Sequence, residues 1–106
     1  IAYSVAKSAI NNYVKLMSHS LSNKGIVINS IAPGNIYFKG SVWEKKMKKS
    51  RKKTENYIKE NVPMNKFCDP VDIAEAVNFI LNSRNNIITG SNIVIDGGEI
   101  LWFVKL

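Results

Sequence analysis

The sequence predicts an α/β fold with parallel strands, on the evidence of two patterns. Apolar residues recur at helical spacing in residues 3–21 and 73–81, and short β-branched runs at 26–32 and 91–96 each end at a glycine-containing turn. The alternation of helices and strands favours a parallel sheet. Because two strands cannot form a sheet with both faces covered, we expect further strands upstream. The chain is therefore expected to be the C-terminal part, residues 1–106, of one larger domain.

The first helix is expected over residues 1–23. Its apolar residues fall three and four positions apart and define one buried stripe: Val5, Ala9, Ile10, Tyr13, Val14, Met17 and Leu21. Gly25 ends this helix, since glycine readily adopts the left-handed conformation that closes a helix. The strand over 26–32 follows, is expected to be buried on both faces, and ends at Pro33-Gly34.

A loop with weak helical character is expected over residues 37–67. Its helix, Val42 to Asn61, has few apolar residues and should pack lightly. The next helix, 70–83, begins with Asp69 as N-cap and Pro70 in its first position. Its expected buried residues are Ile73, Ala76, Val77, Ile80 and Leu81. The last strand spans 91–96.

The composition excludes several classes of protein. The single cysteine, Cys68, rules out an internal disulfide and a cysteine-rich metal site, so we expect no metal, and a thiol that is either structural or exposed by chance. No apolar run approaches the roughly 18 residues of a membrane span, and the first residues do not resemble a signal peptide. We therefore expect a cytoplasmic protein with no membrane partner.

The net charge of +7 comes from one segment. Eight cations and one acid, Glu44, lie in residues 39–53, and the rest of the chain is neutral. Such a segment can bind nucleic-acid phosphates, attract an anionic substrate or carrier, or form a solvated helix face. Nucleic acid is the least favoured partner, because the segment has one aromatic residue, Trp43, and no recognised binding motif. The solvated face is favoured.

Tyr3 and Lys7 are four residues apart on the first helix, so they face the same way. A tyrosine hydroxyl titrates near pH 10, and a nearby ammonium favours the phenolate, which makes tyrosine a usable general acid or base. The alternative is an ordinary pair on a solvated helix face. His19 has no acidic or cysteine neighbour at helical spacing, so we assign it to the helix surface.

Four segments in order resemble the short-chain dehydrogenase/reductase family, classical type. Tyr3-Ser4-Val5-Ala6-Lys7 resembles its Y-x-x-x-K helix, and the run from Lys24 to Pro33-Gly34 resembles the strand and turn that follow it. Asp69-Pro70-Val71-Asp72 is similar to the family's penultimate helix start. Residues 88–98 are similar to its last strand. The resemblance covers nearly the whole chain.

This resemblance implies the C-terminal portion of a Rossmann-like, doubly wound parallel sheet and an oxidoreductase that uses NAD or NADP. Hydride would pass between the nicotinamide and a carbonyl or alcohol substrate. Tyr3 would be the catalytic acid/base and would also contact the cofactor, and Lys7 would assist it and bind the nicotinamide ribose. Pro33 and Gly34 would line the nicotinamide pocket, and the main chain of Ile36 would contact the carboxamide.

The same resemblance places Tyr37, Phe38 and Trp43 in the substrate loop, with plain packing of this loop as the alternative. Many members have a cofactor-binding threonine at the position of Phe38. A subgroup has Tyr-Phe-x-Gly followed by Trp, as here, so the hydroxyl contact is in doubt.

The family's glycine-rich turn, catalytic serine and relay asparagine precede its Tyr-Lys helix and are absent from these residues. We therefore expect the chain alone to be inactive, and the full-length protein to be a homo-oligomer. The apolar tail 100–104 would lie at a subunit interface or pack within one subunit. A different hypothesis is a non-catalytic remnant that acts as a basic nucleic-acid-binding or protein-interaction module.

Overall fold

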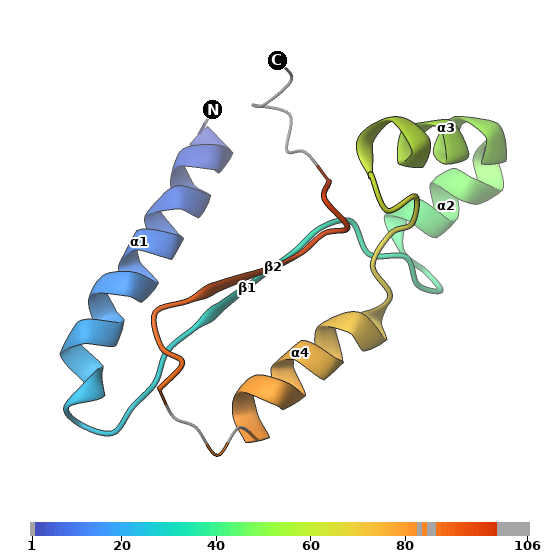
Figure 1. Cartoon of the computed structure of the whole chain (residues 1–106). Coiled ribbons are helices and arrows are strands. Elements are labelled where there is room, and N and C mark those ends of the chain that lie inside the picture. The colour runs from blue at the N-terminus through green and yellow to red at the C-terminus, as the bar shows by residue number, and fades with distance from the viewer. Residues whose placement is uncertain (1, 83, 85–86, 100–106) are drawn as a thin grey trace. The chain divides into compact units, whose positions relative to one another are not determined.

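The computed structural model describes residues 2–82, 84 and 87–99 (Figure 1). Its elements are α1 (Ala2–Ser22), β1 (Ser30–Pro33), α2 (Val42–Lys49), α3 (Arg51–Asn61), α4 (Pro70–Asn82) and β2 (Asn92–Ile95). The fold class is α/β, as predicted. The apolar tail 100–104 and position 83, the expected end of the fourth helix, lie outside the described residues.

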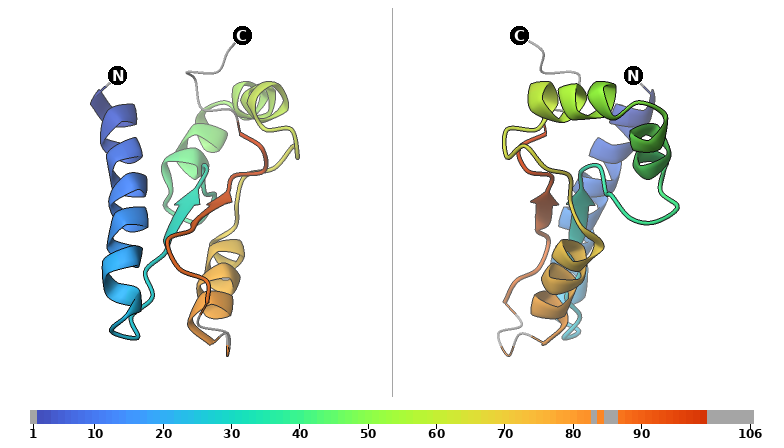
Figure 2. Two further views of the ribbon diagram at one scale, coloured as in Figure 1. Left: turned by 60° about the vertical axis from the view of Figure 1, so that its left-hand side comes forward. Right: turned by 90° about the vertical axis from the view of Figure 1, so that its right-hand side faces the viewer.

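Strands β1 and β2 pair in parallel, and their arrows point the same way in Figure 2. The pairing register is fixed by two main-chain bonds. Ser30 N–H donates to the Ser91 carbonyl over 2.9 Å, and Gly34 N–H donates to the Ile95 carbonyl over 2.9 Å. Because both strands run the same way, the turns that follow Pro33 and Ile95 lie at the same edge of the sheet.

The first strand begins four residues later than the sequence predicts, at Ser30 rather than residue 26. Its expected start faces a turn, not a strand. Thr89 Oγ1 accepts from Ile28 N–H over 3.1 Å, and the Asn29 side chain donates to the Ile88 carbonyl over 2.9 Å. These side-chain bonds, with one main-chain bond from Gly90 N–H to the Ile28 carbonyl over 2.7 Å, replace the regular ladder here. Burial on both faces is also wrong, since Ile26 and Val27 are exposed.

The chain forms two compact units, residues 1–32 with 78–93 and residues 33–77 with 94–106. In the first unit, Val14 and Ser18 of α1 are buried. Gly90 lies so close to Ser18 that a β-carbon there would be 3.0 Å from Ser18 Cβ. This glycine has φ +70°, so both its conformation and its close packing favour glycine.

The second unit has a small core centred on Val62, which is 1% exposed. Cys68, Thr54 and Ser41 are buried in the same unit. The rings of Trp43, Tyr57 and Phe67 form a second cluster, described below. The turn after β2 joins this unit through Met64 N–H, which donates to the Gly97 carbonyl over 3.1 Å.

The basic stretch forms two helices, α2 and α3, where the sequence predicts one over Val42 to Asn61. Ser50 separates them with an extended backbone, φ −156° and ψ 95°. Its N–H donates to the Lys46 carbonyl and its side chain accepts from Lys53 N–H, so it caps both helices. Serine is suited to this position because its hydroxyl satisfies an unpaired amide at a helix start.

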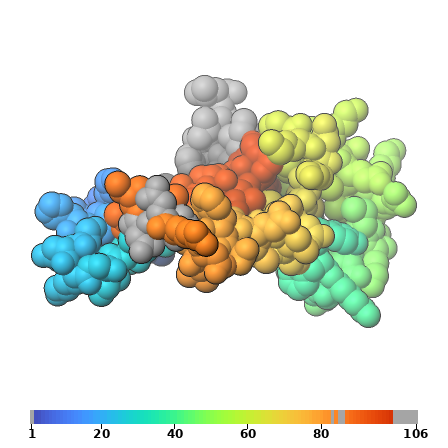
Figure 3. All heavy atoms as spheres, turned by 60° about the horizontal axis from the view of Figure 1, so that its bottom comes forward, coloured from blue at the N-terminus to red at the C-terminus, as the bar shows by residue number. Residues whose placement is uncertain are grey.

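Helix α4 begins as the sequence predicts. Asp69 Oδ1 accepts from Val71 N–H over 2.9 Å, and Asp72 Oδ2 accepts from Asp69 N–H over 2.8 Å. This reciprocal pair satisfies two amides that the helix itself leaves unpaired. Much of the surface of α4 faces the viewer in Figure 3.

The expected buried stripes of the first and fourth helices are largely exposed. Val5, Ile10 and Tyr13 of α1 are exposed, and only Val14 of that stripe is buried. No residue of α4 is buried, and Leu81 is 76% exposed. Two strands offer too little surface to cover two amphipathic helices, so their apolar faces stay open.

Among the described residues, no helix has the length and apolar character needed to cross a membrane.

Candidate active site

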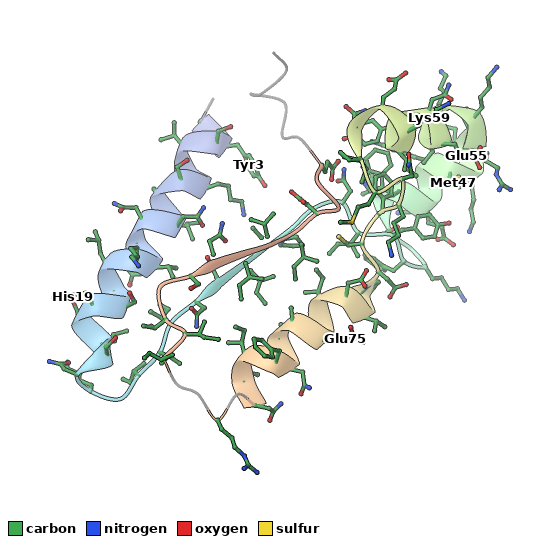
Figure 4. All side chains as sticks on the ribbon, in the orientation of Figure 1. Tyr3, His19, Met47, Glu55, Lys59 and Glu75 are labelled. Atoms are coloured by element: carbon green, nitrogen blue, oxygen red, sulfur yellow. The ribbon has the colours of Figure 1, made fainter. Side chains whose placement is uncertain are left out.

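Tyr3 and Lys7 lie one helical turn apart on α1. Tyr3 is 72% exposed, and Figure 4 shows its side chain projecting near the start of the helix. Lys7 Nζ lies over the Tyr3 ring, 5.5 Å from its centroid, where the electron-rich ring face attracts a cation. The structure therefore brings the two predicted catalytic side chains together. An exposed tyrosine with an ammonium over its ring is available to exchange a proton with a substrate.

Pro33 ends β1 and Gly34 begins the turn after it, and both are predicted to contact the cofactor. A β-carbon on Gly34 would lie 2.7 Å from Asp96 Cβ and 2.8 Å from Asp96 Cα, so only glycine fits without displacement. Both residues lie at the carboxyl end of a parallel strand, the edge at which open α/β sheets bind ligands.

Ile36 continues this turn and pairs with Cys68 in an isolated parallel bridge. Cys68 N–H donates to the Asn35 carbonyl over 3.0 Å, and Tyr37 N–H donates to the Cys68 carbonyl over 2.9 Å. The main chain on both sides of Ile36 is thus held in place, as a backbone contact to a ligand requires.

The three predicted substrate-loop residues have different surroundings. Tyr37 and Phe38 are exposed. Trp43 is packed, with ring centroids 4.7 Å from Tyr57 and 4.6 Å from Phe67. Trp43 thus takes part in packing, while Tyr37 and Phe38 remain free to touch a ligand.

Glu99 is a site residue that sequence reasoning missed. Its side chain is nearly enclosed, at 8% exposed, and reaches the turn after β1. Glu99 Oε2 accepts from Asn35 N–H over 3.0 Å, and Oε1 accepts from Tyr57 Oη over 2.9 Å and from Asn35 Nδ2. The available signal was an acid just after Gly97-Gly98, because parallel strands bring their end turns together.

Two groups near this turn have raised pKa values. Burial, and then the hydrogen bond to Glu99, raise the pKa of Tyr57 above its ordinary 10.0. Burial raises the pKa of the Cys68 thiol above 9.0, and the thiol donates to the Ile95 carbonyl over 2.9 Å. Both groups are therefore protonated donors at neutral pH.

The basic segment is exposed and partly paired within itself. Lys48 lies 3.2 Å from Glu44, and Arg51 lies 2.6 Å from Glu55. Lys46 Nζ lies 4.1 Å from the Trp43 ring centroid. The other five cations of residues 39–53 are exposed. Figure 4 shows Glu55 and Lys59, an acid and a base, on α3.

His19 is exposed on α1 (Figure 4). Over residues 2–82, 84 and 87–99, no three His, Cys, Asp or Glu side chains are grouped so as to hold a metal ion. The predicted site residues fall into two groups, with Tyr3 and Lys7 in the first unit and the residues from Pro33 to Trp43 in the second.

Comparisons with known proteins identify relatives along almost the whole chain. Residues 1–99 match the family model described as enoyl-(acyl carrier protein) reductase. Isoepoxydon dehydrogenase from Aspergillus clavatus is 33% identical over 92% of this chain and 37% of its own length. Glucose 1-dehydrogenase 2 from Bacillus subtilis is 28% identical over 96% of this chain and 38% of its own.

Solved structures agree with the sequence matches. 4-Hydroxyisoleucine dehydrogenase, solved with NADH, has a TM-score of 0.77 at 31% identity over 92% of this chain and 38% of its own. A short-chain dehydrogenase from Francisella tularensis has a TM-score of 0.75 at 30% identity, covering 92% and 43%. The chain thus spans about two-fifths of the length of these relatives and corresponds to one part of their Rossmann-type fold. It belongs to the short-chain dehydrogenase/reductase family.

Proposed function

We propose that the chain is the catalytic C-terminal part of a longer NAD(P)-dependent oxidoreductase. Its reaction would be hydride transfer between a nicotinamide and a small carbonyl or alcohol substrate. The observation that carries this proposal is the pairing of Tyr3 with Lys7 on α1, within a family match over residues 1–99. Coverage of 37% of a relative's length supports the view that the other parts of the site lie outside this chain.

The residues present fit the nicotinamide end of such a cofactor. An exposed ammonium, Lys7, can donate to ribose hydroxyls. Gly34 packs closely against Asp96 at the carboxyl end of β1, the edge at which open α/β sheets bind ligands. The cofactor is NAD or NADP, in line with the NADH bound to 4-hydroxyisoleucine dehydrogenase.

The bound nicotinamide would give or take the hydride. The Tyr3 hydroxyl donates a proton to the carbonyl oxygen when the substrate is reduced, and takes it back when the alcohol is oxidised. The Lys7 ammonium stabilises the negative charge that develops on the Tyr3 oxygen. Pro33, Gly34 and the main chain of Ile36 form one wall of the nicotinamide pocket.

The substrate belongs to the class of small carbonyls and alcohols. Its binding loop contains Tyr37, Phe38 and Trp43. The full-length protein is a cytoplasmic homo-oligomer. Large apolar residues are exposed on α1 and α4, for example Tyr13 and Phe79. They support a further protein-contact surface on these helices.

The test is Tyr3→Phe in the full-length protein, assayed by nicotinamide absorbance against a panel of small alcohols and ketones. Loss of the acid/base should lower kcat by about a hundredfold or more. Tyr13→Phe is the matched control, because Tyr13 is exposed on the same helix. Equal activity in Tyr3→Phe and the parent protein would contradict the assignment.

A further inference from the structure

Glu99 makes an unusual set of contacts for a buried carboxylate. Both of its oxygens accept hydrogen bonds, and the donors are the Asn35 main chain, the Asn35 side-chain amide and the Tyr57 hydroxyl. All of these donors are neutral, and neither ion pair found among the described residues includes Glu99. A buried carboxylate is costly unless it is fully hydrogen-bonded, so these bonds hold their donors firmly in place.

These contacts join three segments that are distant in sequence: the turn after β1, helix α3, and the turn after β2. The Glu99 main chain is itself fixed, since its N–H donates to the Asp96 carbonyl over 3.1 Å. Gly34 lies directly against it, because a β-carbon there would be 2.9 Å from Glu99 Oε2. The turn after β1 therefore rests on the Glu99 carboxylate.

The hydrogen bond from Tyr57 connects Glu99 to helix α3. Tyr57 lies on α3, and its ring packs on Trp43 of α2 and, at 6.1 Å between centroids, on Phe67. Its hydroxyl donates to the same Glu99 oxygen that receives the Asn35 amide. A shift of α3 would therefore displace the Asn35 side chain, and a shift of Asn35 would displace Tyr57 on α3.

We propose that Glu99 is a positioning residue, which fixes the main chain of the turn after β1 and couples it to α3 through Tyr57. This inference rests on the proposed function, in which that turn is the nicotinamide wall. Glu99 touches neither substrate nor cofactor. It pre-forms the turn for cofactor binding and makes cofactor binding sensitive to the position of α3.

The test uses Glu99→Gln in the full-length protein, with Glu75→Gln, an exposed position on α4, as the control. Glutamine has one acceptor oxygen where glutamate has two, so it cannot accept hydrogen bonds from both Asn35 N–H and the Tyr57 hydroxyl as Glu99 does. Deuterium exchange of the peptide containing Asn35 should become about tenfold faster in Glu99→Gln. The dissociation constant for NADH or NADPH, whichever binds the parent protein, should rise about tenfold, while kcat at saturating cofactor stays within about twofold.

Tyr57→Phe removes only the hydrogen bond from α3 to Glu99. It should weaken cofactor binding less than Glu99→Gln does, and it should add nothing further in the Glu99→Gln background, because the shared bond is already lost. Additive effects would overturn the coupling, and unchanged exchange at Asn35 in Glu99→Gln would overturn the positioning role. Faster exchange with unchanged cofactor affinity would also overturn it. A parent protein that binds neither NADH nor NADPH would instead refute the proposed function, while the exchange result would still report on the Glu99 contacts.

Discussion

Tyr57 and Glu99 differ from Tyr3 and Lys7 in how far apart their partners lie in the sequence. Tyr3 and Lys7 meet because a helix places residues four apart on one face, so a local pattern is sufficient to predict their contact. Glu99 lies 64 residues from Asn35 and 42 from Tyr57, so its contacts depend on how turns and helices assemble. No local pattern carries that information, and Glu99 was missed for this reason.

The raised pKa of Tyr57 predicts a loss of stability at alkaline pH. Above about pH 10 the unfolded chain releases the Tyr57 proton while the folded chain keeps it, so the free energy of unfolding falls as the pH rises. Below this window the contribution is fully present. Cys68 acts in the same direction above its ordinary 9.0.

Urea unfolding of the full-length protein between about pH 9 and pH 11 measures this slope. Tyr57→Phe should make the decline shallower, since phenylalanine has no proton to lose. Tyr13→Phe, which removes an exposed hydroxyl, serves as the control. An equal slope in the Tyr57→Phe protein and its parent would show that Tyr57 does not contribute.

The helices and strands differ in how completely they follow local signals. Helix α4 starts where Asp69, Pro70 and Asp72 predict, because capping involves neighbouring residues only. Strand β1 is shorter than its β-branched run, because a strand needs a partner and Thr89-Gly90 form a turn opposite residue 28. The division at Ser50 went unpredicted, although serine is a preferred cap.

Asp69→Ala tests the start of α4. Loss of the side-chain bond to Val71 N–H and of the reciprocal geometry with Asp72 should lower the free energy of unfolding by about 1 kcal/mol. The measurement is chemical unfolding of the full-length protein followed by far-ultraviolet circular dichroism. Glu75→Ala, at an exposed mid-helix position, should change stability by no more than about 0.5 kcal/mol.

For the molecule as a whole, the predicted α/β class is confirmed, but the predicted burial of the apolar helix faces is wrong. The described residues bury few apolar side chains: Val14, Val62 and Cys68. Periodicity identifies the face of a helix that is apolar, but it does not supply the surface that covers that face. The stripes of α1 and α4 were therefore wrongly assigned as buried, apart from Val14.

The sequence also leads to a prediction for the 106-residue chain. It should bind NADH and NADPH too weakly to saturate at micromolar concentrations, since the expected pyrophosphate turn is absent from it. Titration followed by nicotinamide fluorescence measures this, with the full-length protein as the positive control. Saturable micromolar binding by the chain alone would contradict the expectation and would place a complete cofactor site within these residues.

The packing of Trp43 has a practical consequence. Its indole touches Tyr57 and Phe67 and lies under the Lys46 ammonium, so its surroundings change whenever α2 and α3 move apart or together. The chain has two tryptophans, and Trp102→Phe would leave Trp43 as the only one in it. Its emission would then be a built-in optical gauge of motion in these two helices, read without any attached label.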